Sequence, residues 1–362
     1  MESVVNEWLD GVAAVLWRIA QFPVVFQIFI WLCLLSFFFI ALAWIIQRLS
    51  KQSIAANSLV VAWSTAALIS TFFIYIIILD AKETIRQQES ELLQQQILPR
   101  REISSLHAQQ LPPSIESIGA LSWSMLLDTT GVEVYQASCT DPLIQFTMAR
   151  IDMRMVEIKM DTLIDEKEKT SHFAQMHDCL VAVNGEAGNS PDWNAAWGQW
   201  IGNYIVEGRS IFLKDDEHRP FLAFDRVNHA IYSPEKQVDL LVDETKYNSI
   251  WGRFDCVVDG QAAVSRKDES AMAKYPRTLM GIDSTGYKLT LIVCDGRMPD
   301  HSIGMKMFQC ADLMLALDVH DGMACDQGGS SCFYIKDAGI VNKPSDGGER
   351  PVYTHFGVKL RN

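Results

Sequence analysis

The sequence predicts an α+β fold: a mixed, largely antiparallel sheet domain with packed helices, preceded by two transmembrane helices and a helical stalk. Three observations support this prediction. Two long apolar runs lie within residues 1–79, and residues 80–96 are polar and lack both glycine and proline. Residues 119–362 then repeat short apolar runs between turn-forming residues, which is typical of strands joined by tight turns.

The two apolar runs, 24–46 and 59–79, contain no charged residue. Each is long enough for a membrane helix, which needs about 20 apolar residues. The connection between them carries Arg48 and Lys51 and no acid, whereas the segment before them holds three acids and one base. Because basic loops stay in the cytoplasm, we expect both termini and the C-terminal domain on the extracytoplasmic side of a bacterial-type inner membrane.

The segments on either side of the 23–79 anchor have helical patterns. Residues 1–22 place apolar side chains on one face, which favours an amphipathic helix lying on the lipid bilayer; a packing helix of an oligomer fits equally well. Residues 80–118 are predicted to be a helical stalk and a linker containing Pro112 and Pro113. A partial apolar seam in the stalk is compatible with a homo-oligomeric coiled coil or with a solvated single helix.

Residues 119–362 are expected to form the main domain. One helix is predicted over residues 302–317, with Ser302 as its cap and an apolar face packed on the sheet. Paired turn residues such as Glu207-Gly208 and Asp259-Gly260 favour antiparallel hairpins. The predicted strands are 132–135, 143–148, 180–183, 204–206, 221–224, 256–258, 279–282, 289–293, 332–335 and 355–358.

Charge and cysteine content restrict the partners and the chemistry. The net charge is −13, and residues 1–79 carry three acids and three bases, so all of the excess lies after them. An acidic domain without a basic patch makes nucleic acid an unlikely partner. Seven of the eight cysteines follow residue 79, and their spacing predicts no zinc site, so buried free thiols are expected.

A series of polar and glycine-containing motifs follows the predicted strands in the last third of the chain. In order they are 276–281 (PRTLMG), 293–297 (VCDGR), 302–305 (SIGM), 326–331 (DQGGSS), 342–345 (NKPS) and 349–351 (ERP). In this order and spacing the chain resembles the phosphodiester glycosidase family over residues 275–360. The similarity extends more weakly back to 183–186 (VNGE), 202–208 and 251–260.

The resemblance implies hydrolysis of a glycosidic bond, which commonly needs one carboxyl to protonate the leaving oxygen and a second to activate water or attack the sugar. Glu186 and Asp326 are our catalytic pair, because each follows a β-like run into a loop containing glycine. Arginine supplies a planar fork for phosphate. The predicted substrate-binding residues are Asn184, Arg277, Asp295, Arg297, Gly328, Gly329, Ser330, Asn342 and Arg350.

We expect no metal ion and no cofactor; Asp318, His320 and Asp321 fit no known cation-binding loop. The predicted function is that of a membrane-anchored glycosidase acting on a glycosyl phosphodiester or a related glycan. The alternative is a catalytically reduced glycan-binding or assembly module of a membrane oligomer. Gln327 favours this alternative, because the family pattern has a glycine at that position.

Overall fold

The computed structural model describes residues 110–161, 166–186, 202–214, 219–234, 247–267 and 272–361. The predicted interfacial helix, the two apolar runs and nearly all of the stalk and linker lie outside these ranges. Within them, no helix combines the length and the apolar character needed to cross a membrane.

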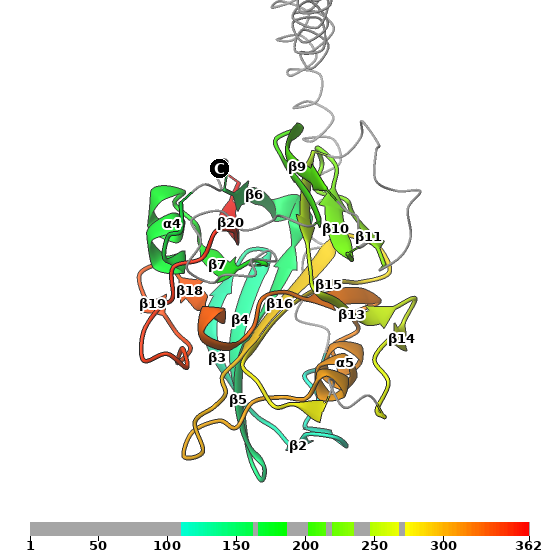
Figure 1. Cartoon of the computed structure of the whole chain (residues 1–362), viewed down its shortest axis with the longest axis vertical. Helices are drawn as coiled ribbons and strands as arrows, with labels where there is room; N and C mark the ends of the chain where they lie inside the picture. The colour runs from blue at the N-terminus through cyan, green and yellow to red at the C-terminus, as the bar shows by residue number, and fades with distance from the viewer. Residues whose placement is uncertain are drawn as a thin grey trace, which may run out of the picture. The chain divides into compact units, whose positions relative to one another are not determined.

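The described chain forms three large antiparallel sheets and one small one (Figure 1). The largest has eight strands in the order β14-β13-β17-β15-β16-β5-β4-β3, and two five-stranded sheets have the orders β11-β10-β12-β8-β9 and β19-β18-β7-β20-β6. The eight strands are β3 (Ser122–Thr129), β4 (Val132–Thr140), β5 (Leu143–Asp152), β13 (Phe254–Val258), β14 (Gln261–Ala262), β15 (Arg277–Ile282), β16 (Lys288–Cys294) and β17 (Asp321–Ala324).

The remaining elements are short. The first five-stranded sheet contains β8 (Gly202–Val206), β9 (Arg209–Lys214), β10 (Phe221–Phe224), β11 (Ala230–Ser233) and β12 (Asn248–Trp251). The second contains β6 (Val156–Met160), β7 (Val181–Asn184), β18 (Phe333–Ile335), β19 (Gly339–Ile340) and β20 (His355–Leu360). Outside the large sheets are β1 (Ser114–Ile115), β2 (Gly119–Ala120), the 3-10 turns η2 (Met153–Met155) and η4 (Gly328–Ser330), and the helices α4 (Thr170–Met176) and α5 (Met307–Ala316).

The predicted α+β class with packed helices is therefore wrong for the described part of the chain, which is mainly β. It contains two α-helices, of 7 and 10 residues, and no helical membrane-spanning preface is shown. All ten predicted strand runs do overlap strands of the structure. The sheets, rather than helices, supply most of the buried apolar surface, because alternate residues of the same strand can pack against two different layers.

The eight-stranded sheet is apolar on both faces, and strand periodicity assigns its residues to two cores. On β16, Leu291 and Val293 pack into the core shared with the five-stranded sheets, whereas Ile292 and Cys294 face α5. In Figure 1 this sheet runs through the middle of the domain with α5 beside β13 and β14. A third, small core packs α4 through Phe173 against β7 and β18. The result is a layered β domain with one short helix on each outer side.

The predicted helix over 302–317 begins later than expected. α5 starts at Met307, and the side chain of Gln309 accepts a hydrogen bond from the backbone N–H of Lys306 at 2.9 Å. Ser302 does not cap it. Its hydroxyl donates to the carbonyl of Asp295 at 2.7 Å and accepts from the N–H of Gln145 at 3.1 Å, so it joins the ends of β16 and β5.

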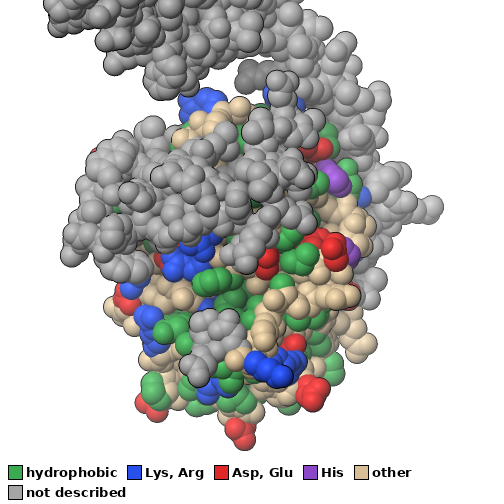
Figure 2. All heavy atoms as spheres, turned by 45° about the vertical axis from the view of Figure 1, so that its right-hand side comes forward, with side chains coloured by type: hydrophobic (Ala, Val, Ile, Leu, Met, Phe, Trp, Pro, Cys, Tyr) green, Lys and Arg blue, Asp and Glu red, His purple; other side chains and the backbone are tan. Residues whose placement is uncertain are grey.

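The predicted tight turns and free thiols are both present. Glu207-Gly208 and Asp259-Gly260 have positive φ at both positions, as a two-residue hairpin turn requires. The seven described cysteines are buried free thiols, and burial raises the pKa of Cys332 to about 12, so it is unsuited to act as a thiolate nucleophile. On the face drawn in Figure 2, acidic, basic and apolar side chains are interspersed.

Candidate active site

Strand ends from two sheets meet at one place and bring the predicted catalytic loops together. β7 ends at Asn184, two residues before Glu186, and β17 ends at Ala324, two residues before Asp326. The backbone N–H of Asp326 donates to the carbonyl of Gly185 at 3.3 Å. The two loops that carry the candidate carboxyls are therefore hydrogen-bonded to each other, although they lie 140 residues apart in sequence (326 minus 186).

Asp326 has the surroundings of a carboxyl that holds its proton. Its side chain is 3% exposed, and one carboxyl oxygen accepts the backbone N–H of Gln327 at 2.9 Å. Burial raises the pKa of Asp326 above its ordinary value. The Ser330 hydroxyl, the Gln327 N–H and the charges of Arg253 and Arg350 oppose that rise without cancelling it. A buried carboxyl of this kind suits proton donation to a leaving oxygen.

Glu186 has the opposite surroundings, because it pairs with an arginine. The carboxyl is 3% exposed, and its Oε1 lies 3.1 Å from both Nε and Nη2 of Arg253. A neighbouring positive charge favours the ionised carboxylate. The main chain is fixed as well, since the Thr354 hydroxyl donates to the Glu186 carbonyl at 2.6 Å. Glu186 is thus a rigidly held carboxylate beside a buried acid.

Arg253 is the site residue that our sequence reasoning missed. It follows β12 and precedes β13, and its N–H donates to the carbonyl of Ala324 at the end of β17. The available signal was the Trp-Gly-Arg-Phe stretch at 251–254, which we matched to the family without assigning a role to its arginine. Gly252 is needed there, because a Cβ would lie 2.7 Å from the sulfur of Met323 and 2.9 Å from the carbonyl of Ala324.

Asn184 joins three segments beneath the catalytic loops. Its Oδ1 accepts the Thr278 hydroxyl at 2.7 Å and the Cys332 N–H at 3.1 Å, and its Nδ2 donates to the carbonyl of Asp326 at 3.3 Å. The side chain is fully buried. These contacts fix the loops relative to one another. A hydrogen bond from Asn184 to a sugar hydroxyl stays a prediction.

Asp295 and Asn342 form a second brace. The Asp295 carboxylate accepts Nδ2 of Asn342 and the N–H of Lys343, both at 3.0 Å, and pairs with Nε2 of His301 at 2.8 Å. Asn342 in turn accepts the N–H of Phe333 at 2.7 Å. The loop after β16 is thereby tied to the start of β18. Direct contact of these two residues with substrate stays a prediction.

Arg277 and Arg297 both lie over the ring of Tyr275, but they differ in how many of their N–H groups already have a hydrogen-bond acceptor. Their guanidinium carbons are 5.3 Å and 5.1 Å from the ring centroid of Tyr275. Arg277 is buried and donates to the carbonyls of Met305 and Ala273 and to the side-chain oxygen of Gln327. Arg297 is exposed and makes no hydrogen bond or ion pair with any residue that the structure describes. Of these two, Arg297 is the one open to an anion.

The glycines of the 326–331 loop allow charged side chains to approach closely. A Cβ on Gly328 would lie 3.0 Å from Nη1 of Arg297, and one on Gly329 would lie 2.1 Å from Oδ2 of Asp346. That same Asp346 oxygen pairs with Arg350 at 2.6 Å. Arg350 also donates to the hydroxyl of Ser330, which lies next to Gly329, at 3.5 Å.

The structure therefore brings the predicted site residues to one region, but in different positions. Glu186 and Asp326 are the two buried carboxyls at its centre, and Arg253 and Arg350 both act electrostatically on Asp326. Arg297 lies at the exposed rim beside the glycine loop. Glycosidases commonly use two carboxyls, one as the acid and one as the base or nucleophile. The two buried carboxyls are therefore compatible with the chemistry of a glycoside-cleaving hydrolase.

Comparison with known proteins identifies the family. The model of the phosphodiester glycosidase family matches residues 177–359, slightly more than half of the chain. The catalytic domain of zebrafish N-acetylglucosamine-1-phosphodiester alpha-N-acetylglucosaminidase, auto-inhibited by its pro-peptide, is similar with a TM-score of 0.53 and 18% identity. The alignment covers 67% of this chain and 88% of that chain.

A hypothetical protein from Synechocystis has the same TM-score of 0.53 at 11% identity, with 66% of this chain and 64% of that chain covered. No curated protein matches the sequence. Both structural similarities concern the fold, while the family match concerns the sequence from the end of α4 to β20. The chain belongs to the phosphodiester glycosidase family and is a hydrolase of that type.

Proposed function

We propose that this protein hydrolyses the bond between the anomeric carbon of a sugar and the oxygen of a phosphodiester or a related envelope glycan. The observation that carries the proposal is the pairing of Asp326, whose pKa is raised by burial, with the arginine-bound Glu186 on hydrogen-bonded loops. The two carboxyls have environments that separate their protonation states, which is how one site provides both an acid and a base.

Asp326 acts as the general acid. In its protonated state it donates to the oxygen that leaves the anomeric carbon, and the carbon–oxygen bond breaks as that oxygen takes the proton. Burial keeps the proton available at pH values where an exposed aspartate is ionised. The Gln327 N–H at 2.9 Å then stabilises the carboxylate that forms.

Glu186 supplies the carboxylate that activates water or attacks the anomeric carbon. The positive charge of Arg253 favours the ionised form of this carboxyl, and its Nε and Nη2 fix the Oε1 at 3.1 Å. Thr354 and Gly185 hold the backbone on both sides, since the Gly185 N–H donates to the carbonyl of Thr354 at 2.7 Å. A rigid carboxylate loses little conformational freedom when the substrate binds.

Arg297 recognises the anionic part of the substrate. Its guanidinium is exposed, lies over Tyr275 and borders Gly328, where the backbone has no side chain to exclude a ligand. Arg277 is less suited to this role, because Gln327 and two carbonyls already accept its hydrogen bonds. An arginine fork binds phosphate oxygens through paired N–H donors, which favours a phosphodiester over a neutral glycoside.

We also infer that the domain acts on the extracytoplasmic side, anchored through residues 1–79. Support comes from the uncharged runs 24–46 and 59–79 and from Arg48 and Lys51 between them. Cysteine introduced at position 50 should be labelled by a membrane-impermeant maleimide after cell lysis and not in intact spheroplasts. Labelling of position 50 in intact spheroplasts would reverse the inferred orientation.

The test is sugar release by the purified full-length protein from a panel of glycosyl phosphodiesters and envelope glycans. Asp326→Asn and Glu186→Gln should each lower the rate by about 10²–10⁴-fold, the usual contribution of a general acid or base. Asp312→Asn is the matched control, because Asp312 pairs with the exposed Arg266 on the surface and should leave the rate unchanged. Wild-type rates in both site variants would refute the assignment.

A further inference from the structure

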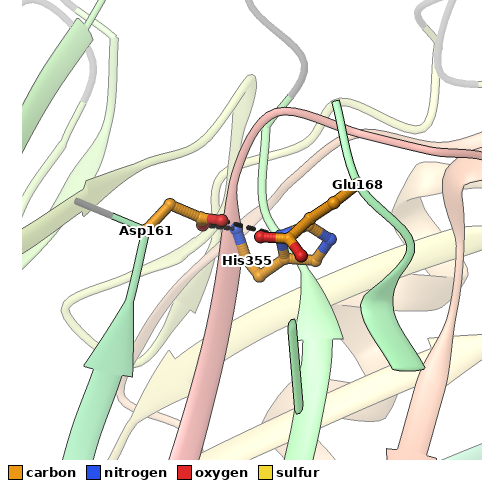
Figure 3. A group of neighbouring side chains, drawn as sticks. All are labelled: Asp161, Glu168 and His355. Carbon is orange, nitrogen blue, oxygen red and sulfur yellow. Dashed lines mark hydrogen bonds and ion pairs between the residues drawn. The ribbon is translucent and has the colours of Figure 1, made fainter. Parts of the chain in front are cut away.

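A second group of titratable side chains lies at the ends of three segments (Figure 3). Asp161 directly follows β6, Glu168 precedes α4, and His355 is the first residue of β20. One ligand atom from each lies within 4.8 Å of the others. Asp161 is 4% exposed and His355 is fully buried, whereas the Glu168 side chain is 33% exposed and opens the group to solvent.

Among the residues that the structure describes, the two carboxylates of this group have hydrogen-bond donors and histidines as partners, but no lysine or arginine. Asp161 accepts the Tyr204 hydroxyl at 3.3 Å, the His355 N–H at 2.5 Å and Nδ1 of His355 at 3.0 Å. Glu168 pairs with Nδ1 of His172 at 2.5 Å. Within the described ranges, no lysine or arginine forms an ion pair with either residue. Two carboxylates this close repel each other unless a positive charge lies between them.

The imidazole of His355 is also only half satisfied. Its Nδ1 faces Asp161, while its Nε2 is buried and has no hydrogen-bond partner in the described part of the chain. The ring is fixed by stacking on Phe173, with 4.8 Å between the ring centroids and 14° between the planes. Figure 3 shows the carboxylates of Asp161 and Glu168 gathered at the imidazole of His355, with dashed lines joining Asp161 and His355.

We propose that Asp161, Glu168 and His355 bind a divalent transition-metal ion of the zinc type. Imidazole nitrogen and carboxylate oxygen are both zinc ligands, with bonds of about 2.0–2.2 Å, so two ligands of one tetrahedral ion lie roughly 3.3–3.5 Å apart. Nδ1 and Oδ1 at 3.0 Å need only a small separation to reach that spacing. On binding, the Nδ1–H bond is replaced by a nitrogen–metal bond, and its proton passes to Nε2 or to solvent.

The position of the group indicates that the ion positions the active site rather than reacting. Thr354 precedes His355, and its hydroxyl holds the carbonyl of Glu186 at 2.6 Å. His355 is also the register partner of Asn184 on β7. An ion at Asp161 and His355 would therefore fix the start of β20 beside the loop that carries Glu186.

The chain offers a matched control in a second group of similar composition, formed by Asp259, His320 and Asp321. These residues are exposed or half-buried, and one oxygen of Asp321 already accepts the Asp259 N–H at 2.8 Å. The other Asp321 oxygen pairs with the adjacent His320 at 2.7 Å. A surface group of this kind has no buried charge that requires a cation.

The experiment is zinc titration of the full-length protein after chelator treatment, by calorimetry and by elemental analysis of the dialysed sample. We expect one zinc ion per chain and a melting temperature that rises with zinc concentration. Glu168→Gln and Asp161→Asn should each weaken zinc affinity about tenfold or more. Asp321→Asn should leave affinity and stoichiometry unchanged.

The proposal is overturned if the wild type binds no stoichiometric zinc, if wild type and Glu168→Gln have equal zinc affinity, or if Asp321→Asn loses as much affinity as Glu168→Gln. Glu168 is partly exposed, so its substitution keeps the test decisive even if Asp161→Asn fails to fold. His172→Gln tests whether zinc binds instead to the exposed pair of His172 and Glu168. Zinc binding that persists in this variant supports the site formed by Asp161, Glu168 and His355. Zinc binding that disappears assigns the ion to His172 and Glu168.

Discussion

Replacing Arg253 by methionine tests the central assumption about the site, namely that this arginine keeps Glu186 ionised. The carboxyl of Glu186 is 3% exposed and the Arg253 side chain 23% exposed. Breaking a fully buried ion pair costs about 3–5 kcal/mol. Because Arg253 retains some contact with water, we expect a loss of about 2–3 kcal/mol in the free energy of unfolding at neutral pH.

The same change should shift the pH dependence of catalysis. Because a neighbouring positive charge favours the ionised carboxylate, its loss should move the acidic limb of kcat/KM toward higher pH. The stability deficit of the variant should be larger at neutral than at acidic pH, because the Arg253 charge stabilises only the ionised form of the neighbouring carboxyl.

The assay is a pH–rate profile of sugar release together with urea unfolding at two pH values. Arg253→Lys should give intermediate values, because it keeps the charge and loses one of the two nitrogen contacts. Arg266→Met removes an exposed pair with Asp312 and should cost less than about 1 kcal/mol without moving the profile. A profile of Arg253→Met that superposes on the wild type would refute the reasoning.

Three further substitutions test single features of the site. Asp326→Asn, besides lowering the rate, should be more stable than the wild type at pH values above the raised pKa of Asp326, and the difference should disappear in acid, because the buried carboxyl binds its proton more tightly in the folded state. Urea unfolding at several pH values measures this, and an Asn variant that is less stable at high pH would contradict it. Gln327→Gly removes the side-chain oxygen that accepts an N–H of Arg277, so this N–H becomes available to an anion. Inhibition by inorganic phosphate should become about tenfold stronger. An unchanged inhibition constant would show that this N–H does not face the ligand. Gly329→Ala should displace the aspartate–arginine pair that lies against it and lower kcat/KM with little effect on unfolding, whereas Gly348→Ala, where a Cβ meets nothing within 4 Å, should change neither.

Much of the local structure was predictable because it depends on residues close in sequence. Period-two apolar patterns and positive-φ turn pairs specify strands and hairpins over a few residues, and each of the predicted runs overlaps a strand. Glycine-containing loops after those strands also pointed to Glu186 and Asp326. Short motifs in a fixed order were enough to indicate the family, since they preserve the loops that the strands present.

The start of α5 and the fold class were predicted wrongly for a related reason. Ser302 has the chemistry of a helix cap, but it is used five residues before the helix to join Asp295 and Gln145. A local pattern cannot show that competition, because the partners lie on different strands. The fold class failed for the same reason. How many helices pack on a sheet depends on how much of that sheet another sheet already covers, and a local pattern does not show this.

The partners of the polar site residues depend on the tertiary structure. Arg253 reaches Glu186 across 67 positions, Asn184 reaches the Asp326 carbonyl across 142, and His355 reaches Asp161 across 194. Hydrogen bonds and ion pairs act over about 3 Å, so they depend on which strand ends meet rather than on neighbours in sequence. Strands, turns and family motifs depend on residues close in sequence and could be predicted from it. The meeting of two sheet edges set the burial of Asp326, the pairing of Glu186 with Arg253 and the exposure of Arg297.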